Sequence, residues 1–313
     1  MADRAAEPTQ CGLPPRVAGT VVTVGTFDGV HRGHHDVLAR LVARSRRTGL
    51  PSVLVTFEPH PAEVVKPSSA PPLLTVGDEK LAILAESGID YCAVVPFTRT
   101  LAAYPAEQFV ESVLRRRFRM RELLVGYDHG FGRDRAGGIN VLRALGERDG
   151  FPVEVVPPFR LDDGQTISST AIRRAILGGD LPWAAGALGR PYSVSATVRH
   201  GEKRGRLLGY PTLNLGPPPP RKLLPPEGVY AVRVQTPSGA YGGMMNLGPR
   251  PTFGDSHTSL EAHLFDAGGD WYAAPVTVEF VARLRETRRF AGPEALVAQL
   301  QLDAAQARDA LTV

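Results

Sequence analysis

The sequence is poor in cysteine and has no long apolar runs, and each scarcity excludes a class of protein. Only Cys11 and Cys92 occur in 313 residues, too few for the disulfide framework of a small secreted domain. The longest apolar runs, such as Val21–Val24 and Ser52–Phe57, fall far short of the ~18 residues that cross a bilayer. The first residues lack the apolar stretch of a secretion signal. We therefore expect a cytoplasmic protein with no membrane partner.

Lysine is also scarce, because 32 of the 36 basic residues are arginine. The 32 acidic residues are interspersed among them, and the net charge is only +4. The chain therefore lacks the basic domain of a nucleic-acid reader, and we expect neither a nucleic-acid partner nor an obligate protein partner. The 43% hydrophobic and 22% charged residues are ordinary for a globular protein. At about 100–200 residues per domain, the length indicates two domains.

The pattern of predicted elements divides the chain into three parts. Residues 1–16 are polar and without periodicity, and we expect a flexible arm. From 17 to 188, strand-length apolar runs alternate with helical patterns, which predicts an α/β domain with a parallel sheet. Gly189-Arg190-Pro191 marks a boundary. From 189 to 313, short runs at hairpin spacing predict a small antiparallel β-barrel, followed by a helix over Pro293–Leu311.

The predicted strands of the first domain are Val21–Gly25, Ser52–Phe57, Tyr91–Pro96, Glu122–Gly126 and Val153–Val156. Its predicted helices cover His31–Arg47, Asp78–Ser87, Ala106–Phe118, Ile139–Arg148, Ser168–Gly178 and Leu181–Leu188. The predicted barrel strands are Tyr192–His200, Pro211–Leu215, Gly228–Gln235, Gly242–Leu247, Ser259–Phe265 and Pro275–Leu284.

The segment Val24–His34 joins the first predicted strand to the first predicted helix. Gly25 allows a tight turn, and Gly33 removes side-chain bulk. His31 and His34 lie one turn apart at the helix N-terminus, where unpaired backbone N–H groups point outward. Such a helix end attracts phosphate. The two imidazoles can therefore join the backbone amides in binding one polyphosphate.

Plainer interpretations of these residues stay open. Asp28 could cap the helix while the histidines are incidental, or the histidines could share a zinc ion, although no third ligand is apparent. A second segment, Ile167–Arg173, opens a later helix with three hydroxyls and then Arg173, which can hold phosphate oxygens in bidentate fashion. Ser168 could instead serve only as a cap. The loop Gly126–Gly132 follows a predicted strand, where parallel sheets hold ligands.

Together these segments resemble the nucleotidylyltransferase family with the H-x-G-H motif, and within it the FMN adenylyltransferase module of bacterial bifunctional FAD synthetases. The matching segments are Gly25–His34, Thr56–Pro61, Gly126–Gly132 and Ile167–Arg173. The resemblance implies a Rossmann-like domain that uses ATP and Mg²⁺ to convert FMN into FAD. Asp128 matches the family's usual flavin-binding Asp or Asn, whereas His129-Gly130 departs from its usual Phe and polar or basic residue. The implied residues for ATP and its phosphates are Gly25, Phe27, Gly33, Ser169, Thr170 and Arg173.

The chemistry of this transfer restricts the roles of the two histidines. The attacking group is the phosphate of FMN, whose second pKa of about 6 makes it an anion at neutral pH. No general base is required. We therefore interpret His31 and His34 as catalytic groups that stabilise the developing charge, together with Mg²⁺.

A second set of polar residues lies in the predicted barrel. Thr212 and Asn214 are two apart, so on a strand both face one side and offer neutral oxygens to a hard cation such as Mg²⁺. In Leu260–Phe265 the apolar residues alternate with Glu261 and His263, which share the other face. A carboxylate there could accept a hydroxyl proton. Ordinary side-chain to backbone bonds in a turn, and a solvated strand face, are the plainer alternatives.

This half resembles riboflavin kinase, a six-stranded barrel. The matching segments are Gly209–Leu215, Pro226–Val232, Asn246–Phe253, Leu260–Phe265 and Phe280–Arg285. The resemblance implies metal binding by Thr212 and Asn214, catalysis by Glu261 as the base for the riboflavin 5′-hydroxyl, phosphate contacts by Gly205 and Arg206, and a flavin contact by Arg285.

A base such as Glu261 is what this reaction needs, because an alcohol, unlike a phosphate, is protonated at neutral pH. The sequence thus predicts a bifunctional enzyme that makes FMN from riboflavin and then FAD from FMN, both with ATP. Two alternatives stay open: a cytidylyl- or pantetheine-type transferase, and a flavin-binding regulator without turnover.

Overall fold

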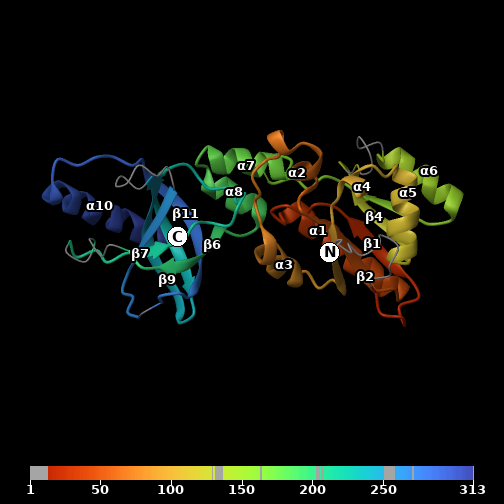
Figure 1. Ribbon diagram of the computed structural model, residues 1–313, viewed down its shortest axis with the longest axis horizontal. Helices are drawn as coiled ribbons and strands as arrows, with labels where there is room; N and C mark the ends of the chain where they lie inside the picture. The colour runs from red at the N-terminus through yellow and green to blue at the C-terminus, as the bar shows by residue number, and fades with distance from the viewer. Residues whose placement is uncertain are drawn as a thin grey trace, which may run out of the picture. The chain divides into compact units, whose positions relative to one another are not determined.

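The computed structural model describes residues 13–128, 130, 137–162, 164–201, 205, 208–249, 258–269 and 271–312 (Figure 1). By its internal contacts the chain divides into two compact units, Met1–Ile167 and Ser168–Val313. Among the described residues, no helix combines the length and apolar content needed to span a bilayer.

The first unit contains the predicted parallel sheet. Its five strands pair in the order β3-β2-β1-β4-β5, and every pairing is parallel. The order reverses between β1 and β4, because β1 leads to β2 on one side and the chain later returns to the other side. The strands are β1 (Thr20–Val24), β2 (Ser52–Glu58), β3 (Tyr91–Pro96), β4 (Met120–Gly126) and β5 (Val153–Val156).

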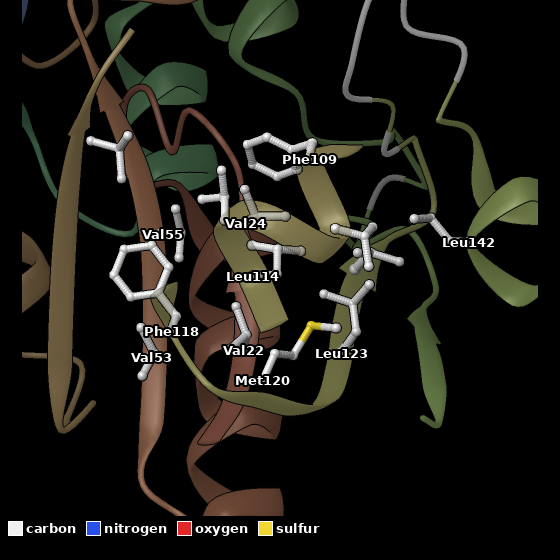
Figure 2. Packing of buried hydrophobic residues seen from close by; sticks show 14 of the residues in the cluster. Val22, Val24, Val53, Val55, Phe109, Leu114, Phe118, Met120, Leu123 and Leu142 are labelled. Carbon is white, nitrogen blue, oxygen red and sulfur yellow. The ribbon is translucent and has the colours of Figure 1, made fainter. Parts of the chain in front are cut away.

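Helices cover both faces of this sheet. Alternate strand residues point to opposite faces, so Val21 packs with α1 and α3 while Val22 packs with the helices of the other face. Figure 2 shows this second face, where Val22, Val24 and Leu123 meet Phe109 and Leu114. The helices are α1 (Arg32–Thr48), α2 (Pro61–Val65), α3 (Gly77–Ala85), α4 (Arg99–Ala102), α5 (Ala106–Phe109), the π-helix η2 (Val110–Arg117) and α6 (Ile139–Asp149), with a 3₁₀ turn η1 at Pro67–Ser69.

The expected flexible arm differs from the structure over its last residues. Leu13 is buried in the core cluster of the sheet. The Arg119 guanidinium donates hydrogen bonds to the carbonyls of Pro14, Pro15 and Val17. One apolar side chain and one arginine produce no periodic pattern, so the sequence did not reveal this anchoring. Residues 1–12 lie outside the described residues.

The second unit contains the predicted barrel, and it is closed. Six strands pair antiparallel in the order β10-β7-β6-β11-β8-β9, and β9 pairs with β10 to complete the ring. The barrel strands are β6 (Tyr192–Arg199), β7 (Leu213–Leu215), β8 (Gly228–Thr236), β9 (Gly239–Pro249), β10 (Thr258–Leu264) and β11 (Pro275–Arg285).

Over the part of the barrel unit that the structure describes, the helices are α7 (Ser169–Leu177), α8 (Leu181–Leu188) and α10 (Pro293–Thr312). Leu300, Ala307 and Leu311 of α10 pack over Ala231 and Met244 on the outside of the barrel. The α/β and antiparallel-barrel predictions are both confirmed. The contacts divide the chain after Ile167, so α7 and α8 belong to the barrel unit. The boundary near residue 188 stays a prediction.

Candidate functional sites

The parallel sheet brings two predicted motifs to one place. The segment that begins at Gly25 follows the carboxyl end of β1, and Tyr127 and Asp128 follow the carboxyl end of β4. These strands are neighbours, and the strand order reverses between them, which is where open α/β sheets bind ligands. Asp128 is exposed there. His129 and residues 131–136 lie outside the described residues.

The two histidines form a stacked pair at the N-terminus of α1. His31 is the N-cap residue: its Nδ1 accepts from the backbone N–H of His34, and the Nδ1 of His34 accepts from the N–H of His31, each at 3.3 Å. The ring centroids are 3.6 Å apart and the planes differ by 14°. Because each Nδ1 is an acceptor, the proton of each neutral ring lies on Nε2. Both rings therefore carry an N–H donor beside the positive end of the helix.

Asp28 does not cap this helix, so the alternative interpretation of its role is wrong. Its carboxylate is 3% exposed and accepts from the backbone N–H groups of Leu74 and Thr75, at 2.9 and 3.1 Å. The chain after Asp28 turns through positive φ values, 84° at Gly29 and 38° at Val30. His31, rather than Asp28, therefore reaches the N-cap position.

The residues predicted to bind ATP in this motif surround the histidine pair. Phe27 lies 4.6 Å from His34, centroid to centroid. A Cβ added at Gly33 would lie 3.2 Å from the His31 ring, and one at Gly25 would lie 3.0 Å from the Phe27 ring. Each glycine therefore lets one ring lie closer to the backbone than an alanine would allow. Among the described residues, no group of three or more His, Cys, Asp or Glu side chains is placed to hold a metal.

The second predicted phosphate motif opens α7. Ser168 is the N-cap residue, and its hydroxyl accepts from the N–H of Ala171 at 3.2 Å. Ser169 and Thr170 begin the helix, and Arg173 follows one turn later. These residues belong to the second compact unit, so the roles of Ser169, Thr170 and Arg173 in ATP binding stay predictions.

On the barrel, three polar residues lie in register on adjacent strands. Glu261 of β10 is directly opposite Asn214 of β7 on one side and Asn246 of β9 on the other. The strand neighbours of Glu261, Leu260 and Ala262, are buried, whereas Asn246 directly opposite Glu261 is exposed, so Glu261 faces outward. Residues directly opposite in a ladder share a face, with Cβ atoms about 5 Å apart. The barrel therefore presents one carboxylate between two amides.

The glycine-rich loop packs closely against the predicted metal ligands. A Cβ at Gly201 would lie 2.0 Å from Nδ2 of Asn214, whose residue is only 9% exposed. A Cβ at Gly205 would lie 2.2 Å from the Tyr210 carbonyl and 3.6 Å from Oγ1 of Thr212. At Gly201 and Gly205 the backbone therefore lies close to Asn214 and to the Tyr210–Thr212 segment.

Of the two arginines of the barrel predicted to contact phosphates or flavin, the structure describes only Arg285. Arg206 lies outside the described residues. Arg285 donates through Nε and Nη2 to the carboxylate of Asp303, with contacts of 2.7 to 3.1 Å, and through Nη1 to the carbonyl of Glu286. The guanidinium is thus engaged in an internal ion pair, and its contact with flavin stays a prediction.

Two residues of these sites were not identified from the sequence. Asn246 belongs to a segment that carried the riboflavin kinase resemblance, but only the strand register shows that it faces Glu261. Lys80 lies in α3 and is buried near the carboxyl end of β2. A single lysine in a helical pattern gives no indication of this position.

Comparison with known families covers nearly the whole chain. The family model described as FAD synthetase matches residues 14–171, and the model described as riboflavin kinase matches residues 188–311.

Full-length relatives carry the same two descriptions. The bifunctional riboflavin kinase/FMN adenylyltransferase of Pseudomonas fluorescens is 40% identical, with 95% of this chain and 94% of the relative covered. The protein of the same description from Escherichia coli strain K12 is 39% identical, with 93% and 92% covered. A crystal structure from Streptococcus pneumoniae, described as a macrolide-efflux protein, has a TM-score of 0.85 and 30% identity and covers 96% of both chains.

Proposed function

The chain belongs to the family of bifunctional riboflavin kinase/FMN adenylyltransferases, and from that premise we propose how its two halves divide the chemistry. The barrel transfers the γ-phosphoryl group of ATP to the 5′-hydroxyl of riboflavin and makes FMN. The parallel-sheet domain transfers AMP from a second ATP to FMN and releases FAD and pyrophosphate. Both family models and the full-length relatives support this assignment, and we prefer it to the transport description of the structural neighbour.

The row Asn214–Glu261–Asn246 carries the proposal for the kinase half. Glu261 faces outward on the barrel, and we assign it the removal of the proton from the riboflavin hydroxyl, because an alcohol is a poor nucleophile while protonated. The Thr212 hydroxyl and the Asn214 amide supply the neutral oxygen ligands that Mg²⁺ accepts, so this donor set fits the ion. When bound with ATP, Mg²⁺ neutralises charge on the transferring phosphates.

The stacked histidines carry the proposal for the adenylyltransferase half. The attacking FMN phosphate is already an anion, so His31 and His34 act as donors to the phosphates of ATP rather than as bases. Their Nδ1 atoms accept backbone hydrogens, which leaves Nε2–H as the donor of each neutral ring. We assign Asp128 to the flavin, and Ser169, Thr170 and Arg173 to the ATP phosphates.

We further propose that the protein works in the cytoplasm on these small molecules, without a nucleic-acid, membrane or obligate protein partner. The scarcity of cysteine and the interspersed charges support this proposal.

The division of labour is tested with two variants in the full chain. Glu261→Gln should reduce FMN formation by about 100-fold or more, because a positioned general base contributes on that scale. It should leave the conversion of supplied FMN to FAD intact. His31→Ala should reduce FAD formation by roughly 100-fold, the scale for one lost charge-stabilising donor, and leave FMN formation intact. Chromatographic separation of FMN and FAD over time measures both rates.

Glu279→Gln provides the matched control, since Glu279 lies on β11, another strand of the same barrel. It should leave both rates unchanged. If either variant lost both activities equally, the assignment of one reaction to each half would be wrong.

A further inference from the structure

Helix α3 buries a lysine beside the site built by the parallel sheet. Lys80 is 7% exposed, and its Nζ lies 3.4 Å from both Oγ1 of Thr56 and the carbonyl of Phe57, at the carboxyl end of β2. Burial lowers the pKa of Lys80, and the nearby carboxylates of Glu58 and Asp28 oppose that shift. Burying a charge is costly unless it is paired and hydrogen-bonded, and lysine is among the residues least often buried.

Thr56 connects this lysine to the loop before the histidines. Thr56 is fully buried, and its hydroxyl donates to the backbone carbonyl of Thr26 at 3.1 Å. A lysine ammonium can only donate, whereas a hydroxyl has one hydrogen and two lone pairs. The Lys80 ammonium therefore occupies an acceptor site of the hydroxyl, which directs the hydroxyl hydrogen to Thr26. Lys80 thus donates to Thr56, and Thr56 donates to the carbonyl of Thr26.

The loop Thr26–Val30, which accepts the hydrogen bond from Thr56, has an unfavourable backbone conformation. Phe27 has φ of 48° and Val30 has φ of 38°, a region that is uncommon for any residue with a Cβ and an outlier for a β-branched one. Such conformations are strained and persist only where the surroundings restrain them. His31 and the start of α1 follow Val30 directly, so the loop conformation sets where the histidines lie.

Hydrogen bonds restrain this loop from two sides. On one side, Asp28 accepts from the backbone N–H groups of Leu74 and Thr75, and the N–H of Gly29 donates to the hydroxyl of Thr75 at 3.0 Å. On the other side, the only side-chain hydrogen bond to the Thr26 carbonyl among those described is the one from Thr56. Lys80 also places a positive charge near the buried carboxylate of Asp28.

We propose that Lys80 is a positioning residue for adenylyl transfer: it acts through Thr56 to hold the Thr26–Val30 loop in the conformation that places His31 and His34. The inference rests on the function proposed for that site. Lys80 contacts the restraining groups rather than the histidines, so it affects the geometry of the transition state and not the identity of the groups that touch ATP.

The test uses the full chain with Lys80→Met, Thr56→Val and the double variant. Methionine keeps most of the length of lysine but removes its charge and donors, and valine keeps the shape of threonine without the hydroxyl. Each single variant should lower kcat for FMN adenylylation by roughly 10- to 100-fold, since displacements near 1 Å in a site cost up to that amount. The KM values for ATP and FMN should change less than threefold. Riboflavin kinase activity, measured on the same samples, should be unchanged.

The coupling between Lys80 and Thr56 distinguishes a positioning role from a general loss of stability. If Lys80 acts through Thr56, the double variant should lose no more activity than Lys80→Met alone, because residues in one network are not additive. Losses that multiply would overturn the proposal. Lys80→Arg, which keeps the charge and donors, should recover at least a third of the wild-type kcat.

Lys66→Met is the matched control, because Lys66 is exposed in the same unit, and it should have no effect. Unchanged adenylylation in Lys80→Met and Thr56→Val would overturn the role of Lys80, even where the wild type makes FAD. If the wild type made no FAD, the proposed function would fail instead. If Lys80→Met did not fold, as judged by circular dichroism, Thr56→Val would decide alone, because it keeps the lysine and removes only the connection.

Discussion

At the residue scale, a missing side chain controls the barrel site as strongly as the side chains present. Gly201 lies where a Cβ would be 2.0 Å from Nδ2 of Asn214. Gly201→Ala should therefore displace the Asn214 amide from its position next to Glu261. We expect riboflavin kinase kcat/KM for Mg-ATP to fall by roughly 10- to 100-fold, while adenylylation of supplied FMN is unchanged. Steady-state kinetics of both reactions measure the effect.

Gly268→Ala is the control for this prediction, because a Cβ at Gly268 meets no atom within 4 Å. It should leave kinase activity at the wild-type level. Full kinase activity in Gly201→Ala would mean that the amide of Asn214 can move without cost, and would argue against its proposed role at the metal.

The residues that the sequence singles out most readily are those with an obligatory chemical type at a fixed spacing. Gly25, His31 and Gly33 were identified in this way, and the structure places them around one helix end. Asn246 and Lys80 were missed for a physical reason. The position of Asn246 depends on strand register across the barrel, and that of Lys80 depends on the packing of α3 against β2. Neither relation is local in the sequence.

At the scale of elements, hydrophobic periodicity predicted the long helices and the strands. The start and end of β3 and β5 agree with the predicted ranges, since both strands are bounded by clear turn residues. The helices α2 and α4 were missed because five and four residues are too few to show a period of 3.6. The alternative in which Asp28 caps the helix is wrong, because the turn at Gly29 and Val30 brings His31 to the N-cap position. Asp28 instead accepts from the backbone N–H groups of Leu74 and Thr75.

An ion pair between Asp303 and Arg285 joins the last helix to the barrel, and its contribution to stability can be measured. Asp303 of α10 is fully buried and holds Arg285 at the end of β11, while Gln299 donates to the same carboxylate at 2.7 Å. Asp303→Ala would leave the Arg285 charge largely buried without its partner. We expect it to lower the free energy of unfolding of the barrel by about 3–5 kcal/mol, measured by denaturant titration.

The exposed pair of Arg308 with Asp266 gives the comparison for this ion pair. Asp266→Ala should leave the free energy of unfolding almost unchanged, because water screens exposed pairs. Equal effects of the two substitutions would show that Asp303 does not fix α10 to the barrel. Loss of riboflavin binding without loss of stability in Asp303→Ala would support instead the predicted contact of Arg285 with flavin.

At the scale of the whole molecule, the two proposed sites differ in the proton chemistry that their acceptors demand. An alcohol acceptor requires a carboxylate, and the barrel provides Glu261. A phosphate acceptor requires charge stabilisation, and the parallel-sheet unit provides the stacked histidines. The Asn214–Glu261–Asn246 row lies within the barrel unit, and the stacked His31–His34 pair lies within the parallel-sheet unit.

This separation predicts complementation between two defective chains. Glu261→Gln should make FMN very slowly but use supplied FMN normally, and His31→Ala should make FMN normally but convert it to FAD very slowly. Because FMN is a stable product of one reaction and the substrate of the other, a mixture of the variants should form FAD from riboflavin after a lag. The lag should shorten as the concentration of both chains rises, since FMN must first accumulate in solution. Time courses of FMN and FAD, with each variant alone as the control, measure this. If the mixture made no FAD although each variant kept its remaining activity, FMN would have to stay bound to the chain that makes it.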